Sequence, residues 1–352
     1  MKTAKSIIEL AQEIQRQALS KRDFIVPTQV TQVEINGHQQ IAFNGNVFDL
    51  TDHALAQIAD RLKIPKRFLN YLRAENPSLL EHNINDLFKK FPELRMIRTL
   101  DGQARAFLSD RYRPLDNFGL SNAVFPALQA ADAKIVSCDI TERKMYIKAA
   151  IPHICELIPG ASHMGDDHIN PSIMISNSEI GLGGLTVLPG LHDPICTNLC
   201  FFSSDKHTKF HLGRKVQSDD QYGVYSDRTK RLSDAAVFAQ LKDTIEASLG
   251  GEVFKQIVNR VRNARGQVIE EKQVQKVIEV TSKKFSLNED EKGSVLAYLI
   301  ERGDLSQWGI SSAITRASED VADYDRASEL ESLGSKIIEF PQNEWRQLVS
   351  AA

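Results

Sequence analysis

The chain has 352 residues, of which 42% are hydrophobic and 25% are charged, and its formal net charge is −3. This composition is typical of folded proteins and excludes a wholly disordered or a collagen-like chain. No segment approaches the ~20 consecutive apolar residues of a membrane-spanning helix, and polar residues stand where a signal peptide has its apolar segment. Four cysteines are too few for a disulfide framework, so we expect a cytoplasmic protein with no membrane partner.

The first ninety residues predict helices around short strands. Apolar residues at helical spacing indicate an amphipathic helix over residues 1–22. Asn-Gly pairs at 36–37 and 44–45 supply the positive φ angles that tight hairpin turns require. A helix is expected to begin at Thr51 or the aspartate after it, and Pro65 separates this helix from a second, shorter one.

A β-rich segment follows. The Asp-Gly pair at 101–102 predicts a hairpin turn, and Asp116 is expected to cap a helix over 117–131. Residues 152–170 have the composition of a loop. The glycine-rich run 179–184 indicates a bend between strands, because no Lys-Ser/Thr pair follows it as in a phosphate-binding loop. Further strands are expected at 134–139, 144–150, 172–176, 185–188 and 195–202.

From about residue 232 to 330 the pattern is helical, which gives an α+β protein rather than alternating β and α units. We expect a β-rich central domain whose hairpins pack on helices, followed by a helical C-terminal third. The last segment, 286–352, has 13 acidic and 6 basic residues. The mildly basic remainder is a weak indication of a polyanion partner, and an ordinary solvated helical face is the favoured explanation. The three predicted regions are 1–93, 94–231 and 232–352.

Four stretches of the sequence are distinctive: LTDHALAQIADRLKIPKRFL (50–69), RAFLSDRYRPLDN (105–117), ISNSEIGLGGLTVLPGLHDPICTN (175–198) and QWGISSAITRASEDVADYDRASELESLG (307–334). Together they resemble the phage/plasmid-like proteins, a family catalogued as a domain of unknown function. The resemblance covers about residues 45–335 and implies a mobile-element setting but no activity. A second resemblance, in the outline of a hairpin, a helix and more strands edged with Arg and Lys, is to the Rad52-like single-strand annealing proteins, which oligomerise and hold DNA in a basic groove.

Basic and aromatic residues alternate in the predicted hairpin at 94–113, as in proteins that bind single strands by phosphate contacts and base stacking. Positions 105, 107, 109, 111 and 113 have one parity and would share one face of a strand. The alternative is a solvated sheet face whose cations pair with nearby aspartates. A second basic cluster lies in a polar segment, and the alternative there is an ordinary surface loop. The expected nucleic-acid contacts are Arg105, Phe107, Arg111, Tyr112, Arg113, Lys144, Lys148, Lys206, Lys209, Arg214 and Lys215.

Two other patterns carry weaker hypotheses. The helix–turn–helix at 55–72 has four cations that could contact phosphates, but a packed helical hairpin is the favoured explanation; the cations are Lys63, Lys66, Arg67 and Arg73. His, Cys and Asp residues are frequent in 153–200, but Cys196 and Cys200 on one strand would lie ~13 Å apart, too far for one zinc ion.

The leading hypothesis is a non-enzymatic protein that binds single-stranded DNA as a homo-oligomer and anneals complementary strands, with no catalytic residue, metal or cofactor. The first alternative is a metal-dependent nuclease or hydrolase that uses region 153–200. The second is a protein that blocks a host defence by binding another protein.

Overall fold

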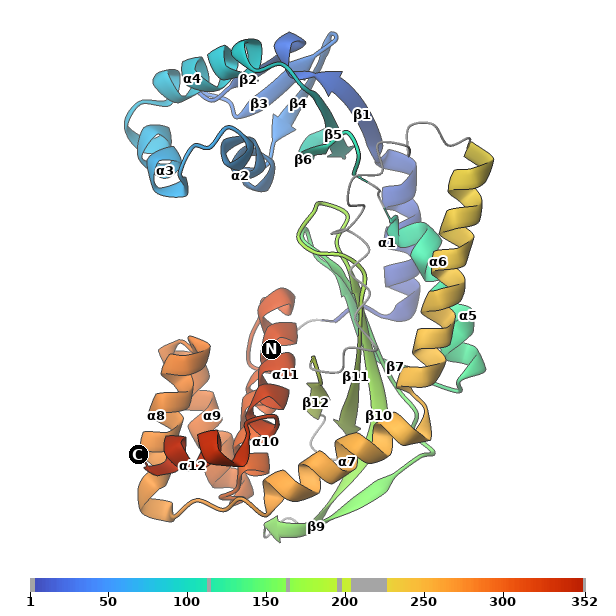
Figure 1. The fold of residues 1–352 in the computed structure, drawn as a ribbon, viewed down its shortest axis with the longest axis vertical. Coiled ribbons are helices and arrows are strands. Elements are labelled where there is room, and N and C mark those ends of the chain that lie inside the picture. Colours follow the sequence, from blue (N-terminus) through green and yellow to red (C-terminus); the bar gives the residue numbers. More distant parts are fainter. Residues whose placement is uncertain (1–3, 113–114, 163–164, 195–197, 204–226, 351–352) are drawn as a thin grey trace.

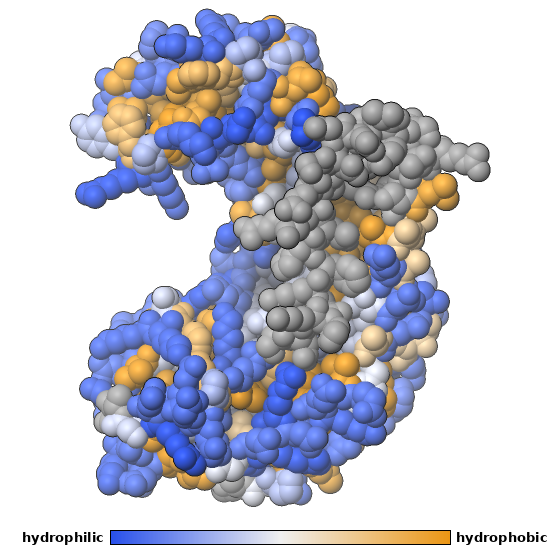
Figure 2. All heavy atoms as spheres, viewed as in Figure 1, coloured by the Kyte–Doolittle hydropathy of each residue, from blue (hydrophilic) through white to orange (hydrophobic). Residues whose placement is uncertain are grey.

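The computed structural model describes residues 4–112, 115–162, 165–194, 198–203 and 227–350 (Figure 1). Two β-sheets and a helical C-terminal part confirm the α+β class expected from the sequence. In Figure 1 the central sheet and the helices beside it form a spine, from which the N-terminal sheet and the C-terminal helices project on one side. Figure 2 shows the molecule hollowed between these two projecting parts.

The N-terminal sheet has the strand order β1-β5-β6-β4-β3-β2, with β4 and β6 parallel and the other neighbours antiparallel. Both residues of the 44–45 and 101–102 pairs have positive φ angles, which confirms two of the three predicted tight turns; in the 36–37 pair only Gly37 has a positive φ. Three helices pack on the sheet around a core that includes Ile41, Ile58 and Ile84. The elements are β1 (Arg22–Pro27), β2 (Thr31–Glu34), β3 (Gln40–Phe43), β4 (Asn46–Leu50), α2 (Asp52–Arg61), α3 (Lys66–Glu75), α4 (Pro77–Lys90), β5 (Leu94–Leu100) and β6 (Gln103–Ser109).

Local sequence explains these helices. The Thr51 side chain accepts a hydrogen bond from the backbone N–H of Ala54 and so caps α2, as predicted. Lys63 adopts a positive φ at the end of this helix, and Pro65 immediately precedes α3. The strands β5 and β6, which were expected to open the β-rich core, belong to the N-terminal sheet, so the predicted boundary at residue 94 falls inside that sheet.

The central sheet has the order β12-β11-β10-β8-β7, and β9 pairs with β10. Three helices pack against one face, where Leu10, Leu120, Ile147 and Leu241 share a core. Residues 152–170, predicted as a loop, contain β9 and the first part of the long strand β10. The elements are α1 (Ile7–Ser20), α5 (Asn117–Ala130), β7 (Lys134–Ile140), β8 (Met145–Ala150), β9 (Glu156–Ser162), β10 (Gly165–Asn177), β11 (Thr186–Asp193), β12 (Asn198–Phe201) and α6 (Asp227–Ser248).

The C-terminal helices form a core of their own, which includes Ile278, Leu299, Ile314 and Trp345. Tyr324, at the start of α11, packs on the face of the central sheet opposite to α1 and α5. The predicted helical C-terminal third is therefore confirmed. Its elements are α7 (Gly251–Arg265), α8 (Val274–Phe285), α9 (Glu289–Arg302), α10 (Gln307–Ala317), α11 (Tyr324–Ile338) and α12 (Gln342–Ser350).

The tip of the β10–β11 hairpin, residues 178–185, joins the two sheets. Ile180 is buried against side chains of β5 and β6, and its carbonyl oxygen lies 2.9 Å from Nε2 of His53 and accepts a 2.8 Å hydrogen bond from Nε2 of Gln57. Gly181 has a φ of +81°, and a Cβ atom there would lie 2.7 Å from Cδ2 of Leu108. The predicted glycine-rich bend is thus the contact that fixes the central sheet on the N-terminal sheet.

Candidate nucleic-acid interface

Two cavities that share Arg143 and Leu182 form a groove between the N-terminal helices and α11. The upper cavity, of about 730 Å³, lies between α2, α3 and the β7–β8 turn at residues 141–144. The lower cavity, of about 760 Å³, lies over β8, β10 and β11 and is bordered by α11. Both volumes are within the ~300–1,000 Å³ range of small-molecule sites.

Most acidic groups of the upper cavity already have a cationic partner. Arg73 donates to Asp52 over 2.7 Å. Arg16 binds Glu13 at 2.8 Å and Asp101 at 2.9 Å. The hydrogen bonds from Arg73 and Arg16 hold the pKa values of Asp52 and Asp101 below their ordinary range, so both carboxylates are ionised at pH 7; Arg73 neutralises Asp52, and Arg16 is shared between Asp101 and Glu13.

Three cations along the groove make no ion pair with any residue in the described ranges: Lys66 and Arg143 in the upper cavity, and Lys144 in the lower one. Glu142 is an acidic residue in the same turn as Arg143 and Lys144. The surplus charge near the β7–β8 turn is therefore positive. At the α11 end the lower cavity is acidic, since Arg326 is shared between Glu291 and Glu329.

Helix α3 has an unusually exposed surface. Of its ten residues only Leu69 and Leu72 are buried, whereas Phe68 is 48% and Tyr71 is 61% exposed. Residues 61–74 contain no acidic side chain, and Arg67 is exposed on the same helix. Aromatic rings that face solvent beside cations are the combination that single-strand binding requires. Neither Phe68 nor Tyr71 was among the contact residues expected from the sequence, so this feature was missed.

Helical spacing separates two flanks of α3. Lys66, Asn70 and Arg73 line the upper cavity, whereas Phe68 and Tyr71 do not. A turn of 3.6 residues places Phe68 and Tyr71 beside each other on the flank away from the cavity. A chain that contacts both flanks must cross the ~10 Å width of the helix.

Two of the predicted contact residues are interior residues, which corrects their assignment. Phe107 is 4% exposed and stacks on Phe88 with ring centroids 5.7 Å apart. Lys148 has no exposed surface: it donates to Oγ of Ser328 over 2.8 Å and pairs with Glu331. Neither side chain can reach a nucleic acid in this fold.

The predicted common face of positions 105–113 is also wrong. Ala104 pairs with Thr99 and Ala106 pairs with Arg98, so Arg105 is an extra residue, a β-bulge, in β6. A bulge shifts the alternation of side chains by one position. Arg105 therefore turns toward the hairpin tip, whereas Phe107, beyond the bulge, turns into the core with α4.

The remaining predicted residues are distributed over several sites. Tyr112 is partly buried, its hydroxyl donates to the carbonyl oxygen of Ser178 over 3.4 Å, and burial raises its pKa. Arg111 is exposed and Lys144 is half-buried in the lower cavity. The structure thus leaves Arg111 and Lys144 accessible. Outside the described residues lie Arg113, Lys206, Lys209, Arg214 and Lys215.

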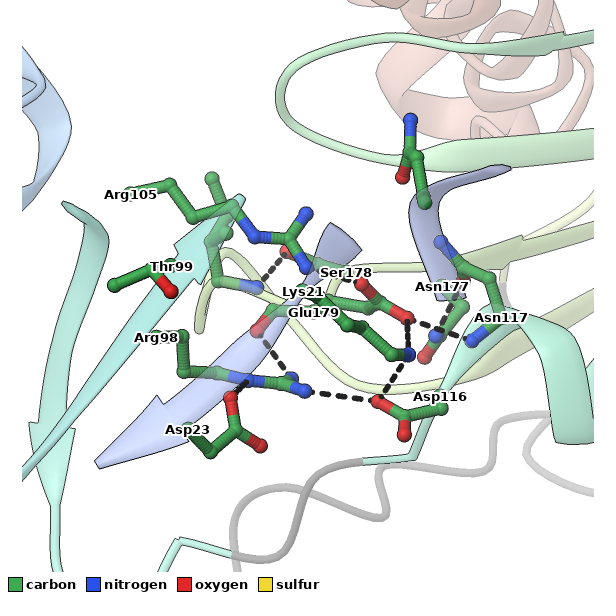
Figure 3. A network of polar contacts seen from close by, with 12 residues as sticks. Lys21, Asp23, Arg98, Thr99, Arg105, Asp116, Asn117, Asn177, Ser178 and Glu179 are labelled. Carbon is green, nitrogen blue, oxygen red and sulfur yellow. Dashed lines mark hydrogen bonds and ion pairs between the residues drawn. The ribbon is translucent and has the colours of Figure 1, made fainter. Parts of the chain in front are cut away.

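A buried polar network lies behind the upper cavity (Figure 3). Its centre is Glu179 on the hairpin tip, which pairs with Arg105 and Lys21 and accepts a 2.8 Å hydrogen bond from the backbone N–H of Asn117. Burial alone would raise the pKa of Glu179, but the charges of Arg105 and Lys21 outweigh it and hold the pKa below the ordinary value. The charge of Arg105 is therefore neutralised within the protein.

Arg98 extends this network to three chain segments. It has no exposed surface, and it donates at 2.8 Å to Asp23 and to Asp116. A third 2.8 Å bond goes to the carbonyl oxygen of Glu179. Asp116 therefore does not cap α5 as predicted, because Arg98 and Lys21 bind its carboxylate. The network fixes the orientation of the two sheets and makes one wall of the groove rigid.

A second buried cluster anchors the C-terminal helices. Asp167 of β10 pairs with Arg265 and Arg302 and accepts a 2.8 Å hydrogen bond from the indole N–H of Trp308. Both arginines bind this carboxylate, so Asp167 belongs to a structural cluster of ion pairs. Among the described residues no group of three or more His, Cys, Asp or Glu side chains could hold a metal ion, and His163 and Cys196 of region 153–200 lie outside them.

No protein-family model, curated protein or solved structure matches this chain. The resemblances to phage/plasmid-like proteins and to Rad52-like annealing proteins therefore stay predictions. Within the described residues, no helix is both long and apolar enough to cross a bilayer.

Proposed function

We propose that this protein binds single-stranded nucleic acid, with single-stranded DNA favoured, across α3 and into the upper cavity. The observation that carries the proposal is the exposure of Phe68 and Tyr71 on a helix that has Lys66 and Arg67 but no acidic residue before its last position. Base stacking on these rings would be worth ~1–3 kcal/mol per base, and the cations would neutralise the phosphates between the bases.

The path follows from the two flanks of α3. Bases would stack on Phe68 and Tyr71, the backbone would cross the helix beside Arg67, and the next nucleotide would reach Lys66 in the upper cavity. Arg143, on the far wall, would contact the phosphate of that nucleotide from the other side. In a duplex the faces of the bases are stacked on one another, so a duplex could contact the cations but could not stack on the two rings.

The helix pair α2–α3 also supports a second candidate, binding of duplex DNA by a helix-turn-helix. Its four-residue connection, 62–65, is close to the three or four residues of that motif. The exposed rings favour the single-strand hypothesis, because a recognition helix reads base edges with polar side chains. Strand annealing, homo-oligomer formation, a metal-dependent hydrolase and an inhibitor of host defence stay predictions from the sequence.

Fluorescence anisotropy of labelled single- and double-stranded oligonucleotides tests the proposal. The wild-type protein should bind single strands at least tenfold more tightly than duplex and should lose affinity between ~50 and ~200 mM salt. The double variant Phe68→Ala/Tyr71→Ala should bind single strands at least tenfold more weakly, whereas Phe91→Ala, which removes a 62% exposed ring from the end of α4, should bind like wild type. Equal affinity of the double variant and wild type would contradict the proposal, and a preference for duplex would favour the helix-turn-helix.

A further inference from the structure

The upper cavity has the composition of a small-molecule site. Apolar side chains from three elements line it, among them Leu55 of α2, Leu69 of α3 and Leu182 of the hairpin tip. The amides of Asn70 and Gln103 also line it, and neither makes a side-chain hydrogen bond with a described residue. An apolar body with a few free polar groups is typical of small-molecule sites.

Two cations of this cavity could bind an anion. Arg73 neutralises Asp52 and Arg16 is shared between Glu13 and Asp101, whereas Lys66 and Arg143 make no ion pair with a described residue. The arginine and the lysine belong to different walls, α3 and the β7–β8 turn, so a phosphate between them would be bound from both sides. Cations on two walls together with an apolar lining match a phosphate joined to an aromatic ring system.

The walls are fixed before any ligand arrives. His53 and Gln57 bind the Ile180 carbonyl, and Glu179 holds Arg105, which also lines the cavity. A site that does not have to reorganise loses less free energy on binding. These contacts also explain why α2, the hairpin tip and β6 meet at this one place.

We propose that the upper cavity binds one nucleotide, with its base among the apolar residues of α2, α3 and the hairpin tip and its phosphate between Lys66 and Arg143. This inference rests on the proposed function, because the cavity would bind an unstacked nucleotide of the strand that crosses α3. A free nucleoside monophosphate has the same chemistry. The experiment therefore compares the two sources.

Isothermal titration of the full-length protein with deoxythymidine monophosphate, deoxyadenosine monophosphate and inorganic phosphate tests the site. The variant Ala56→Trp places an indole in the cavity from an exposed position of α2, and Ala74→Trp places one at an exposed position of α3 that does not line the cavity. We expect the monophosphates to bind wild type and Ala74→Trp at least tenfold more tightly than inorganic phosphate does. Ala56→Trp should lose this binding.

The charge reversal Arg143→Glu, at an exposed turn position, is the second variant if Ala56→Trp does not fold. It should weaken monophosphate binding at least tenfold, and Lys134→Glu, an exposed position outside the cavity, should leave it unchanged. Binding of inorganic phosphate as tight as that of the nucleotides would overturn the assignment of the base. Equal nucleotide binding by wild type, Ala56→Trp and Arg143→Glu would overturn the site.

The same variants separate this inference from the proposed function. Phe68→Ala/Tyr71→Ala should weaken oligonucleotide binding and leave monophosphate binding intact, because neither ring lines the cavity. If no monophosphate binds and Ala56→Trp binds a 12-nucleotide strand like wild type, the cavity site is wrong while the α3 surface stands. If monophosphates bind but oligonucleotides do not, the site is one for free nucleotides and the proposed function is wrong.

Discussion

Replacing Glu179 with glutamine should destabilise the junction between the two sheets. The carboxylate is 4% exposed and pairs with both Arg105 and Lys21, so glutamine would leave Arg105 without its anion and Lys21 with Asp116 as its remaining partner. Removing one member of a buried ion pair costs ~3–5 kcal/mol. With an unfolding entropy of ~2.1 cal/mol/K per residue, this corresponds to a Tm lower by roughly 4–7 °C if the whole chain unfolds in one transition.

Thermal unfolding followed by circular dichroism measures this change. The matched control is Glu142→Gln, an exposed position in the β7–β8 turn, which should lie within ~0.5 kcal/mol of wild type. A Glu179→Gln variant that melts within 1 °C of wild type would refute the assignment of Glu179 as the centre of the junction.

The pH dependence provides a second readout of the same variant. The pKa of Glu179 is lower in the folded protein than in the unfolded chain, where it is ~4.3, so the carboxylate stabilises the fold above that pH. This stabilisation is lost as the pH falls through the lowered folded-state pKa. The difference in unfolding free energy between wild type and Glu179→Gln should therefore be largest at neutral pH and shrink below pH ~4. A difference that grows in acid would contradict the sign of the shift.

Three further predictions concern other parts of the fold. Gly181→Ala should lower the unfolding free energy by ~1–3 kcal/mol in urea titration, because its φ is +81° and a Cβ clashes, whereas Gly251→Ala, which has open space, should cost less than ~0.5 kcal/mol. Lys148→Ala should lower the Tm by removing a buried charge partner and leave the Kd of the folded protein for single strands unchanged in anisotropy assays. In peptide mapping after brief alkylation at pH 8, exposed Cys155 should react and Cys138, whose pKa burial raises to about 11, should stay unmodified until the protein unfolds.

Features set by neighbouring residues could be predicted from the sequence. The positive φ angles of Asn44 and Gly45 and the cap at Thr51 depend on a few adjacent positions, and both are found as expected. The α+β class follows from the same local patterns. The bend at 179–184 was also predicted, although its partners at His53 and Gln57 are more than a hundred residues away and have no local signal.

Long-range pairing explains what the sequence could not show. Lys148 is interior because Glu331, 183 positions later, supplies the opposite charge, and no pattern around residue 148 indicates this. Polar residues in 152–170 suggested a loop, yet Asp167 is buried in a strand because Arg265 and Arg302 bind it. The bulge at Arg105 likewise depends on the register of β5 with β6, which strand alternation alone does not reveal.

The same limit applies to the candidate site. Apolar residues on a short helix are usually assigned to the core, and Leu69 and Leu72 are indeed buried. Phe68 and Tyr71 have the same spacing, i to i+3, but lie on a different arc of the helix. A helical projection of 66–75 would have separated the two pairs, and the absence of acidic residues from 61–74 was the accompanying signal.

Ultraviolet crosslinking of the protein to an oligo-deoxythymidine strand, followed by tryptic digestion and mass spectrometry, tests the central claim most directly. Trypsin cleaves after Arg67 and Arg73 and so releases Phe68–Arg73, the peptide that contains both exposed rings. Our account predicts that this peptide carries the main crosslink and that the crosslink is lost at high salt. A protein that crosslinks efficiently through other peptides, with Phe68–Arg73 unmodified, would contradict the assignment of α3 as the binding surface.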